Sequence, residues 1–178
     1  KRGNKVENSF LKSLIIDILV ALALAGAILF FIRPTIVKQT SMQDTLQPND
    51  YIIMYKRAYV SDTPKRGDIV IFKSNLTDEK GKNKLLIKRI IGLPGDEVTI
   101  KGNQLYLNGS KYEEDYIRDG VTPGDVEGYI VPEGKYFTMG DNRIVSIDSR
   151  YDEVGCVSVD EIQGKAVLRL FPFSRIGR

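Results

Sequence analysis

The sequence predicts an all-β domain, mostly antiparallel, preceded by one transmembrane helix. Three observations support this fold class: a single long apolar run near the amino terminus, many short β-type runs after it, and turn residues between those runs. Helix-type periodicity is scarce after the apolar run, so strands should build the rest of the chain. With 178 residues, the chain has room for one anchor and one compact domain.

The apolar run spans residues 14–32 and reads LIIDILVALALAGAILFFI, with Asp17 as its single charge. About 20 apolar residues are needed to cross a bilayer core, so the run is long enough. Four Lys or Arg residues and one Glu precede it within residues 1–13. Positive flanks stay on the cytoplasmic side. We therefore predict a cytoplasmic tail at 1–13, a single-pass anchor in the cell membrane at 14–32 and an extracytoplasmic domain at 33–178.

Two other interpretations of the run are a cleavable signal peptide and a buried helix. The run is long for a signal peptide, and no small-x-small cleavage site follows it before Arg33. A buried amphipathic helix would show a recurring polar face, which this run lacks. Both observations favour an uncleaved anchor.

Short runs of β-type residues follow the anchor, separated by turn residues such as Pro94-Gly95 and Asn108-Gly109. The predicted strands are 35–40, 51–55, 68–72, 85–91, 97–100, 104–107, 136–139 and 164–170. The polar segment 74–83 is predicted to be a loop. Residues 96–134 contain a hairpin and then the Gly- and Asp-rich stretch DGVTPGDVEGY, which indicates a small accessory lobe inserted into the main sheet. Ser158 and Glu161 have the spacing of a capping box, which predicts one short helix there.

The composition excludes several kinds of site. The chain has no histidine, so it cannot use a Ser-His-Asp triad, a Cys-His pair or a histidine-bound metal. Its single cysteine, Cys156, cannot form an intramolecular disulfide and lacks zinc-type neighbours. The net charge is only +3, with no dense basic stripe, so nucleic acid is not an expected partner. We expect neither a metal nor a cofactor.

Three motifs occur in order after the anchor: VKQTSMQDTL at 37–46, KRIIGLPGD at 88–96 and MGDNRIVSIDSR at 139–150. In this order, and with the closing FPFSRIG at 171–177, they resemble the type I signal peptidases. The resemblance covers nearly the whole chain. It implies a membrane-anchored serine endopeptidase with the mostly antiparallel β-fold of that family, a serine–lysine pair, and signal peptides of exported preproteins as substrates.

The chemistry of such a pair can be argued separately from these residues. A serine hydroxyl is a poor nucleophile until a nearby base takes its proton. Without histidine, a neutral lysine can do so, but its pKa of about 10.4 must first fall. Side chains alternate along a strand, so Lys88 should share a face with Leu86 and Ile90. A lysine on an apolar face is costly for stability and suited to act as a base.

The resemblance assigns a role to each matching residue. Ser41 matches the nucleophile and Lys88 the general base. Ser146 matches a serine that hydrogen-bonds and orients the lysine. Asp148 and Arg150 match a structural ion pair behind the site, with Asp141 in the same supporting shell. The Ser41 backbone N–H and a donor at Gln39 would hold the oxyanion.

The chain departs from the family pattern at two positions near the nucleophile. Gln39 stands where Ser or Gly is usual, and Asp44 replaces a proline, which frees the backbone after the nucleophile. By the same resemblance, an extended signal peptide would pair with the strands around 37–41 and 85–88. Shallow pockets would select small side chains at substrate positions −1 and −3. The residues expected to form them are Val37, Met42, Leu46, Leu86 and Ile87.

Three other functions fit the sequence less well. A self-cleaving repressor uses the same pair, but it would begin with a DNA-binding helix-turn-helix rather than an apolar anchor. An inactive membrane-anchored homologue could act as an assembly factor, for example in pilus formation, although retention of Ser41 and Lys88 argues against it. A calcium site in the acidic loop 141–152 does not fit the known spacing. Membrane lipid and a secretion translocon are the further partners expected, and the oligomeric state stays open.

Overall fold

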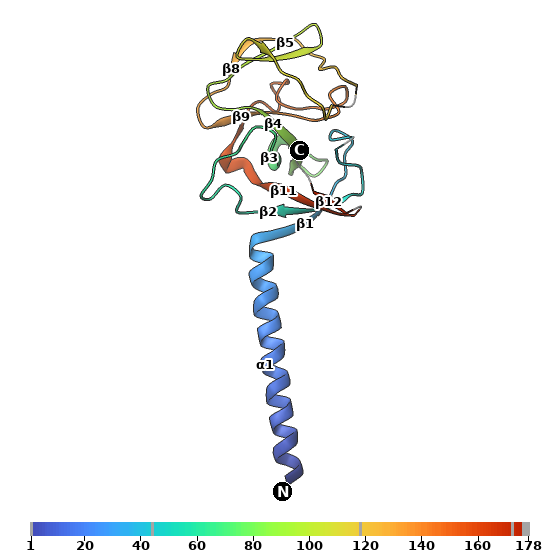
Figure 1. Cartoon of the computed structure of the whole chain (residues 1–178), viewed down its shortest axis with the longest axis vertical. Coiled ribbons are helices and arrows are strands. Elements are labelled where there is room, and N and C mark those ends of the chain that lie inside the picture. The colour runs from blue at the N-terminus through green and yellow to red at the C-terminus, as the bar shows by residue number, and fades with distance from the viewer. Residues whose placement is uncertain (1, 44, 118, 172, 176–178) are drawn as a thin grey trace.

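The computed structural model describes residues 2–43, 45–117, 119–171 and 173–175. One long helix, α1 (Arg2–Phe31), projects from a β domain (Figure 1). Its stretch Leu11–Phe31 is long and apolar enough to span a membrane, and none of it is buried against the protein. An apolar helix that the rest of the protein does not bury needs lipid around it. The predicted fold class, a mostly antiparallel β domain with one amino-terminal apolar helix, is confirmed.

The helix ends one residue earlier than predicted. It stops at Phe31, and Ile32 begins strand β1 (Ile32–Ile36). Pro34 explains this boundary, because the residue before a proline is disfavoured in the helical conformation and the proline ring removes a helical donor. The following chain holds the junction: the Lys56 backbone N–H donates to the Phe31 carbonyl oxygen at 2.8 Å.

The main sheet contains eight strands in the order β1-β2-β11-β3-β4-β9-β10, with β12 paired to β11. All its pairs are antiparallel. Its other strands are β2 (Tyr51–Tyr55), β3 (Ile69–Thr77), β4 (Asn83–Gly92), β9 (Lys135–Met139), β10 (Val157–Ser158), β11 (Ile162–Phe171) and β12 (Ser174–Arg175). Because β1 is an edge strand, Pro34 costs it little.

A second, four-stranded sheet lies at the end of the β domain farthest from α1 (Figure 1). Its order is β7-β6-β5-β8, again antiparallel throughout. Its strands are β5 (Glu97–Lys101), β6 (Gln104–Leu107), β7 (Ser110–Lys111) and β8 (Val126–Ile130). The chain enters this sheet from β4 and returns from it to β9, so it is an insertion between two neighbouring strands of the main sheet.

The predicted loop at 74–83 is too long: β3 continues to Thr77 and β4 begins at Asn83, so only residues 78–82 connect the two strands. Polar side chains support this end of the hairpin. The Ser74 hydroxyl donates to the Lys84 carbonyl at 2.9 Å, and the Asn83 amide donates to the Ser74 carbonyl at 2.7 Å. Such side-chain bonds to backbone are invisible to a rule based on apolar alternation.

Several other elements also differ from the prediction, among them the two-residue strands β7, β10 and β12, which were not predicted. The predicted strand at 35–40 ends at Ile36. Strand β8 was missed because its stretch is rich in Gly and Asp; Gly128 takes a positive φ of 57°, and the pairing with β5 shifts register. The predicted short helix is a 3₁₀ turn at Val159–Glu161, where the Glu161 carboxylate accepts from the Ser158 N–H at 2.8 Å.

Candidate active site

The chain between β1 and β2 forms a turn that presents Ser41. The Leu46 N–H donates to the Met42 carbonyl at 2.8 Å, which closes one helical turn just after the serine. The Met42 and Leu46 side chains are fully buried in a core cluster that also contains Val37. Ser41 itself is 9% exposed. The buried Met42 and Leu46 side chains thus anchor the turn, and Ser41 lies at the edge of this core cluster.

Lys88 of β4 reaches this serine. Its Nζ donates to the Ser41 Oγ at 2.7 Å, and the lysine is only 1% exposed. Strand register places Val70 opposite Lys88, while Leu86 and Ile90 precede and follow it on the same face. These three apolar residues are buried in one core cluster. The structure thus brings together the two residues predicted to react, on the apolar face that was expected.

Burial lowers the pKa of Lys88 from its ordinary 10.5 to about 8. The negative charges of Asp148 and Asp141 act in the opposite direction, and the positive charge of Arg150 adds to the lowering. Among the ion pairs of the described residues, none includes Lys88. Lys88 therefore loses its proton at a much lower pH than an ordinary lysine, and the neutral form that a base requires becomes the major one above about pH 8.

The loop after β9 packs behind the serine and is held by Asp148. This carboxylate accepts two hydrogen bonds from the Arg150 guanidinium, at 2.8 and 2.9 Å, and one from the Gly140 backbone N–H at 3.0 Å. Arg150 also donates to the Ser146 carbonyl at 3.1 Å. The predicted ion pair is present, and it fixes both ends of the loop.

Asp141 makes a second buried ion pair on the other face of β4. Arg89 donates two hydrogen bonds to it, at 2.9 and 2.7 Å, and the Thr45 hydroxyl donates a third at 2.5 Å. Sequence reasoning placed Asp141 near the site but missed Arg89 and Thr45. Arg89 carried a signal: it follows Lys88 in a buried strand, and a buried arginine needs a carboxylate.

Ser146 differs from its prediction. Its Oγ is the one buried side-chain polar atom without a hydrogen-bond partner among the residues that the structure describes, so the expected bond to Lys88 is not formed. The Lys88 amine is directed at Ser41 instead. The Ser146 hydroxyl packs against Gly140, where an added Cβ would lie 2.3 Å from it. Its role in orienting the lysine stays a prediction.

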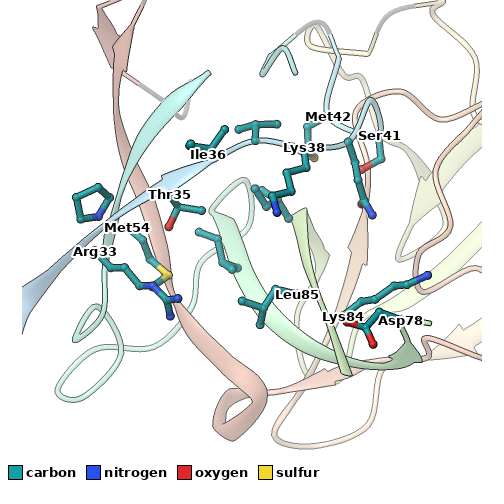
Figure 2. A pocket seen from close by; sticks show the side chains of 15 residues that line it. Arg33, Thr35, Ile36, Lys38, Ser41, Met42, Met54, Asp78, Lys84 and Leu85 are labelled. Atoms are coloured by element: carbon teal, nitrogen blue, oxygen red, sulfur yellow. The ribbon is translucent and has the colours of Figure 1, made fainter. Parts of the chain in front are cut away.

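A pocket of about 620 Å³ extends from Ser41 back toward the membrane helix (Figure 2). It is lined by Val37, Gln39, Met42, Met54, Ile71, Leu85 and Ile87, with Arg33, Pro34, Thr35, Ile36, Lys38, Ser41, Asp78 and Lys84. In Figure 2, Arg33 and Ser41 lie at opposite ends of this pocket. The pocket has an apolar floor, charged groups at its edge and the serine at one end.

Two of the five residues expected to form the substrate pockets are not in its lining. Leu46 is completely buried beneath the Ser41 turn. Leu86 belongs to the core face that carries Lys88, so strand alternation turns its neighbours Leu85 and Ile87 toward the pocket instead. Val37, Met42 and Ile87 do line the pocket, as does Gln39, the expected oxyanion donor.

The two buried carboxylates beside Ser41 and Lys88 are both paired with arginines. Among the described residues, no three His, Cys, Asp or Glu side chains gather into a group that could bind a metal. Asp141 pairs with Arg89, and Asp148 pairs with Arg150. The departure at Asp44 lies outside the described residues.

An antiparallel β domain on an apolar helix, with a serine at the end of a groove and a buried lysine bonded to it, has the features of a membrane-anchored serine hydrolase. The chain belongs to the signal peptidase family, peptidase S26, whose family model matches residues 9–171.

Curated relatives and a solved structure are similar to the chain over most of their length. A signal peptidase I from Bacillus licheniformis is 38% identical, over 99% of this chain and 96% of the relative. Signal peptidase I U from Bacillus subtilis is 37% identical, over 99% and 94%. A crystal structure of a signal peptidase I from Enterococcus faecalis is 33% identical, covers 58% of this chain and 97% of its own, and superposes with a TM-score of 0.47.

Proposed function

We propose that this protein is a membrane-anchored endopeptidase that removes signal peptides from exported preproteins, with Ser41 as the nucleophile and Lys88 as the general base. Family membership supports the activity. The observation that carries the mechanism is the 2.7 Å hydrogen bond between the Lys88 Nζ and the Ser41 Oγ, with the lysine buried. No other base is needed, and histidine is absent from the chain.

The reaction proceeds in two proton-coupled steps. Neutral Lys88 takes the Ser41 hydroxyl proton as the Oγ attacks the scissile carbonyl carbon. The resulting oxyanion is held by the Ser41 N–H and by a donor from Gln39. The Lys88 ammonium then gives its proton to the departing amine, which leaves an ester on Ser41. Lys88 next takes a proton from water, and the hydroxide so formed attacks the ester and releases the signal peptide.

The shape of this pocket determines which substrates bind. An extended peptide along the Val37–Gln39 segment and the Leu85–Ile87 part of β4 would bond through its main chain. Small side chains at positions −1 and −3 would enter the apolar depressions lined by Val37, Met42 and Ile87. Leu46 packs behind these residues in the same core cluster, whereas Leu86 belongs to the cluster beside Lys88. This arrangement accounts for an Ala-x-Ala preference.

The direct test is cleavage of a preprotein by the detergent-solubilised full chain, followed by amino-terminal sequencing of the product. Ser41→Ala and Lys88→Ala should each abolish cleavage, and the double variant should be no worse, because the pair acts as a unit. Ser110→Ala and Lys101→Ala, at exposed positions in the second sheet, are the matched controls. Substantial activity in either site variant refutes the mechanism. A wild-type chain that binds preprotein but never cuts it would favour the assembly-factor alternative.

The orientation in the membrane is a further part of the proposal. The excess of Lys and Arg in residues 1–13 would keep the amino terminus in the cytoplasm and place the β domain outside. Lys56 and Arg57 lie beside the end of α1, where Lys56 donates to the Leu29 carbonyl at 2.5 Å and Arg57 stacks on Phe30. These cations are placed to meet anionic lipid headgroups.

With α1 in the membrane, the pocket would lie near the membrane surface, where a preprotein leaves the secretion translocon. Protease added to intact spheroplasts should digest the β domain. A domain that is protected until the cells are lysed would show the opposite orientation.

A further inference from the structure

A fully buried ion pair joins the inserted segment to the loop behind Ser41. Glu114 lies between β7 and β8, and Arg143 lies after β9; their side chains are 2% and 1% exposed. Both Glu114 oxygens accept from the Arg143 guanidinium, at 2.5 and 2.6 Å. The Tyr116 hydroxyl donates to the same carboxylate, and the Thr122 hydroxyl accepts from Arg143. A buried pair this well satisfied holds both chain segments in one arrangement.

Arg143 in turn fixes the backbone on both sides of Asn142. Its Nε donates to the Gly140 carbonyl at 2.9 Å. Its own carbonyl accepts from Arg150 at 2.8 Å. Asn142, between these two fixed carbonyls, is 6% exposed. The position of Asn142 therefore depends on the guanidinium that Glu114 holds.

Asn142 contacts the nucleophile's own backbone. Its N–H donates to the Ser41 carbonyl at 3.0 Å, and its side-chain Nδ2 donates to the Thr40 carbonyl at 3.3 Å. In a trans peptide the C=O and the N–H point in opposite directions. By holding the Thr40 carbonyl, Asn142 thus sets the direction of the Ser41 N–H, on the opposite side of the same peptide plane.

We propose that Glu114, from the inserted segment, is a positioning residue for catalysis, which acts through Arg143 and Asn142 to aim the Ser41 N–H at the oxyanion. This inference rests on the proposed function, in which that N–H stabilises the transition state. The inserted segment would then contribute to the reaction, since Glu114, Tyr116 and Thr122 all lie between β7 and β8.

The competing interpretation is a pair that only stabilises the fold, and the two differ in measurable ways. A misaimed N–H weakens the tetrahedral state and leaves ground-state binding intact, so kcat falls while KM stays. The charges that act on the Lys88 pKa come from Asp148, Arg150 and Asp141, and not from Glu114. Loss of Glu114 should therefore leave the pH of the rising limb unchanged.

The experiment uses the detergent-solubilised full chain and a peptide substrate with an Ala-x-Ala site. Glu114→Gln and Asn142→Ala should each lower kcat by roughly tenfold or more, which is less than the loss of a whole oxyanion donor. KM should stay within about twofold. A peptide aldehyde, which forms a tetrahedral adduct with Ser41, should lose affinity in step with kcat. Glu113→Gln is the control, because the Glu113 side chain is 80% exposed and pairs with the exposed Lys111.

One further variant separates positioning from stability. Glu114→Gln leaves the Arg143 charge buried without its partner, which can unfold the protein. The double variant Glu114→Leu/Arg143→Met removes both charges, and such replacements often preserve stability. If the pair is only structural, kcat recovers with the melting temperature. If it positions Asn142, kcat stays low in a folded protein.

Wild-type kcat in either the folded Glu114→Gln chain or the folded double variant overturns the inference. So does a fall in kcat with no loss of aldehyde affinity. A wild-type chain that does not cleave the peptide refutes the proposed function instead, before any variant is compared.

Discussion

Replacement of Lys88 by methionine should stabilise the folded protein at pH 6.5 while it abolishes activity. The reason is that the folded state holds this lysine in an apolar site. Its pKa falls from 10.5 to about 8 because the side chain is buried. Each pKa unit corresponds to about 1.4 kcal/mol, so the charged lysine costs the folded state about 3 kcal/mol. Methionine has a similar length and no charge, and it suits a site flanked by Leu86 and Ile90.

The gain is partly offset and depends on pH. Methionine cannot donate to Ser41, and a lost hydrogen bond costs about 1 kcal/mol, so the net stabilisation is about 2 kcal/mol. Below pH 8, folded and unfolded lysine are both protonated, and the full cost of the buried charge applies. Between pH 8 and about 10.4 the unfolded chain binds more protons than the folded one, so wild-type stability rises with pH. The advantage of the variant should shrink across this window.

Equilibrium unfolding in denaturant of the full chain in detergent micelles measures this difference, with far-UV circular dichroism of the β domain at pH 6.5 and 9.5. Lys73→Met is the matched control, because Lys73 is an exposed lysine of β3 and its ammonium stays in water. It should show no comparable pH-dependent gain. The reasoning fails if Lys88→Met is less stable than wild type at pH 6.5, or if its advantage is the same at both pH values.

Three further substitutions test the surroundings of the pair. Gly140→Ala would place a Cβ 2.3 Å from the Ser146 Oγ and 2.4 Å from the Ser41 carbonyl oxygen. The value of kcat for preprotein cleavage should therefore fall at least about tenfold. Full activity would show that the loop after β9 shifts to accommodate the methyl group. Leu86→Gln should admit water beside the amine and raise the Lys88 pKa, which moves the rising limb of kcat/KM to higher pH; an unmoved limb means that Leu86 does not keep the base dry. Ser146→Ala removes a buried hydroxyl without a partner, so it should raise the free energy of unfolding by about 1 kcal/mol, and destabilisation would reveal a bond that the hydroxyl makes.

The strands that the sequence predicted best are those with plain β-type patterns. Tyr51–Tyr55 and Gln104–Leu107 have the predicted bounds, because each run ends at polar or turn residues on both sides. The end of the β3–β4 hairpin could not be predicted in this way. Ser74 and Asn83 are polar, and only their side-chain bonds to the facing strand show why they belong to it. Pairing with the facing strand of the hairpin overrode the local pattern.

The sequence predicted the two residues that react, but not the ion pairs that hold the loop and the strand around them. Ser41 and Lys88 meet as expected, since motif order and the absence of histidine already pointed to a lysine base. The partners of the buried arginines could not be assigned. Arg89 lies 52 residues from Asp141, and Arg143 lies 29 residues from Glu114. Such pairings depend on how sheets and insertions pack, which spacing along the chain does not encode.

Two adjacent cations of β4 show how the fold produces a base. Lys88 and Arg89 follow one another, so alternation sends them to opposite faces of the sheet. Burial acts to lower the pKa of Arg89, but hydrogen bonds and charge from Asp141 outweigh it and raise that pKa, so the arginine stays charged. Among the described residues, no carboxylate forms an ion pair with Lys88, and burial lowers its pKa to about 8.

The carboxylates Asp141 and Asp148 act to raise the Lys88 pKa, but burial outweighs them, because neither carboxylate forms an ion pair with the lysine. Each is already bound: Asp141 by Arg89, and Asp148 by Arg150. The two arginines therefore do more than stabilise the loop behind Ser41. They occupy the anions that would otherwise form an ion pair with Lys88 and hold its proton, so the lysine can become neutral near physiological pH and take the proton of Ser41.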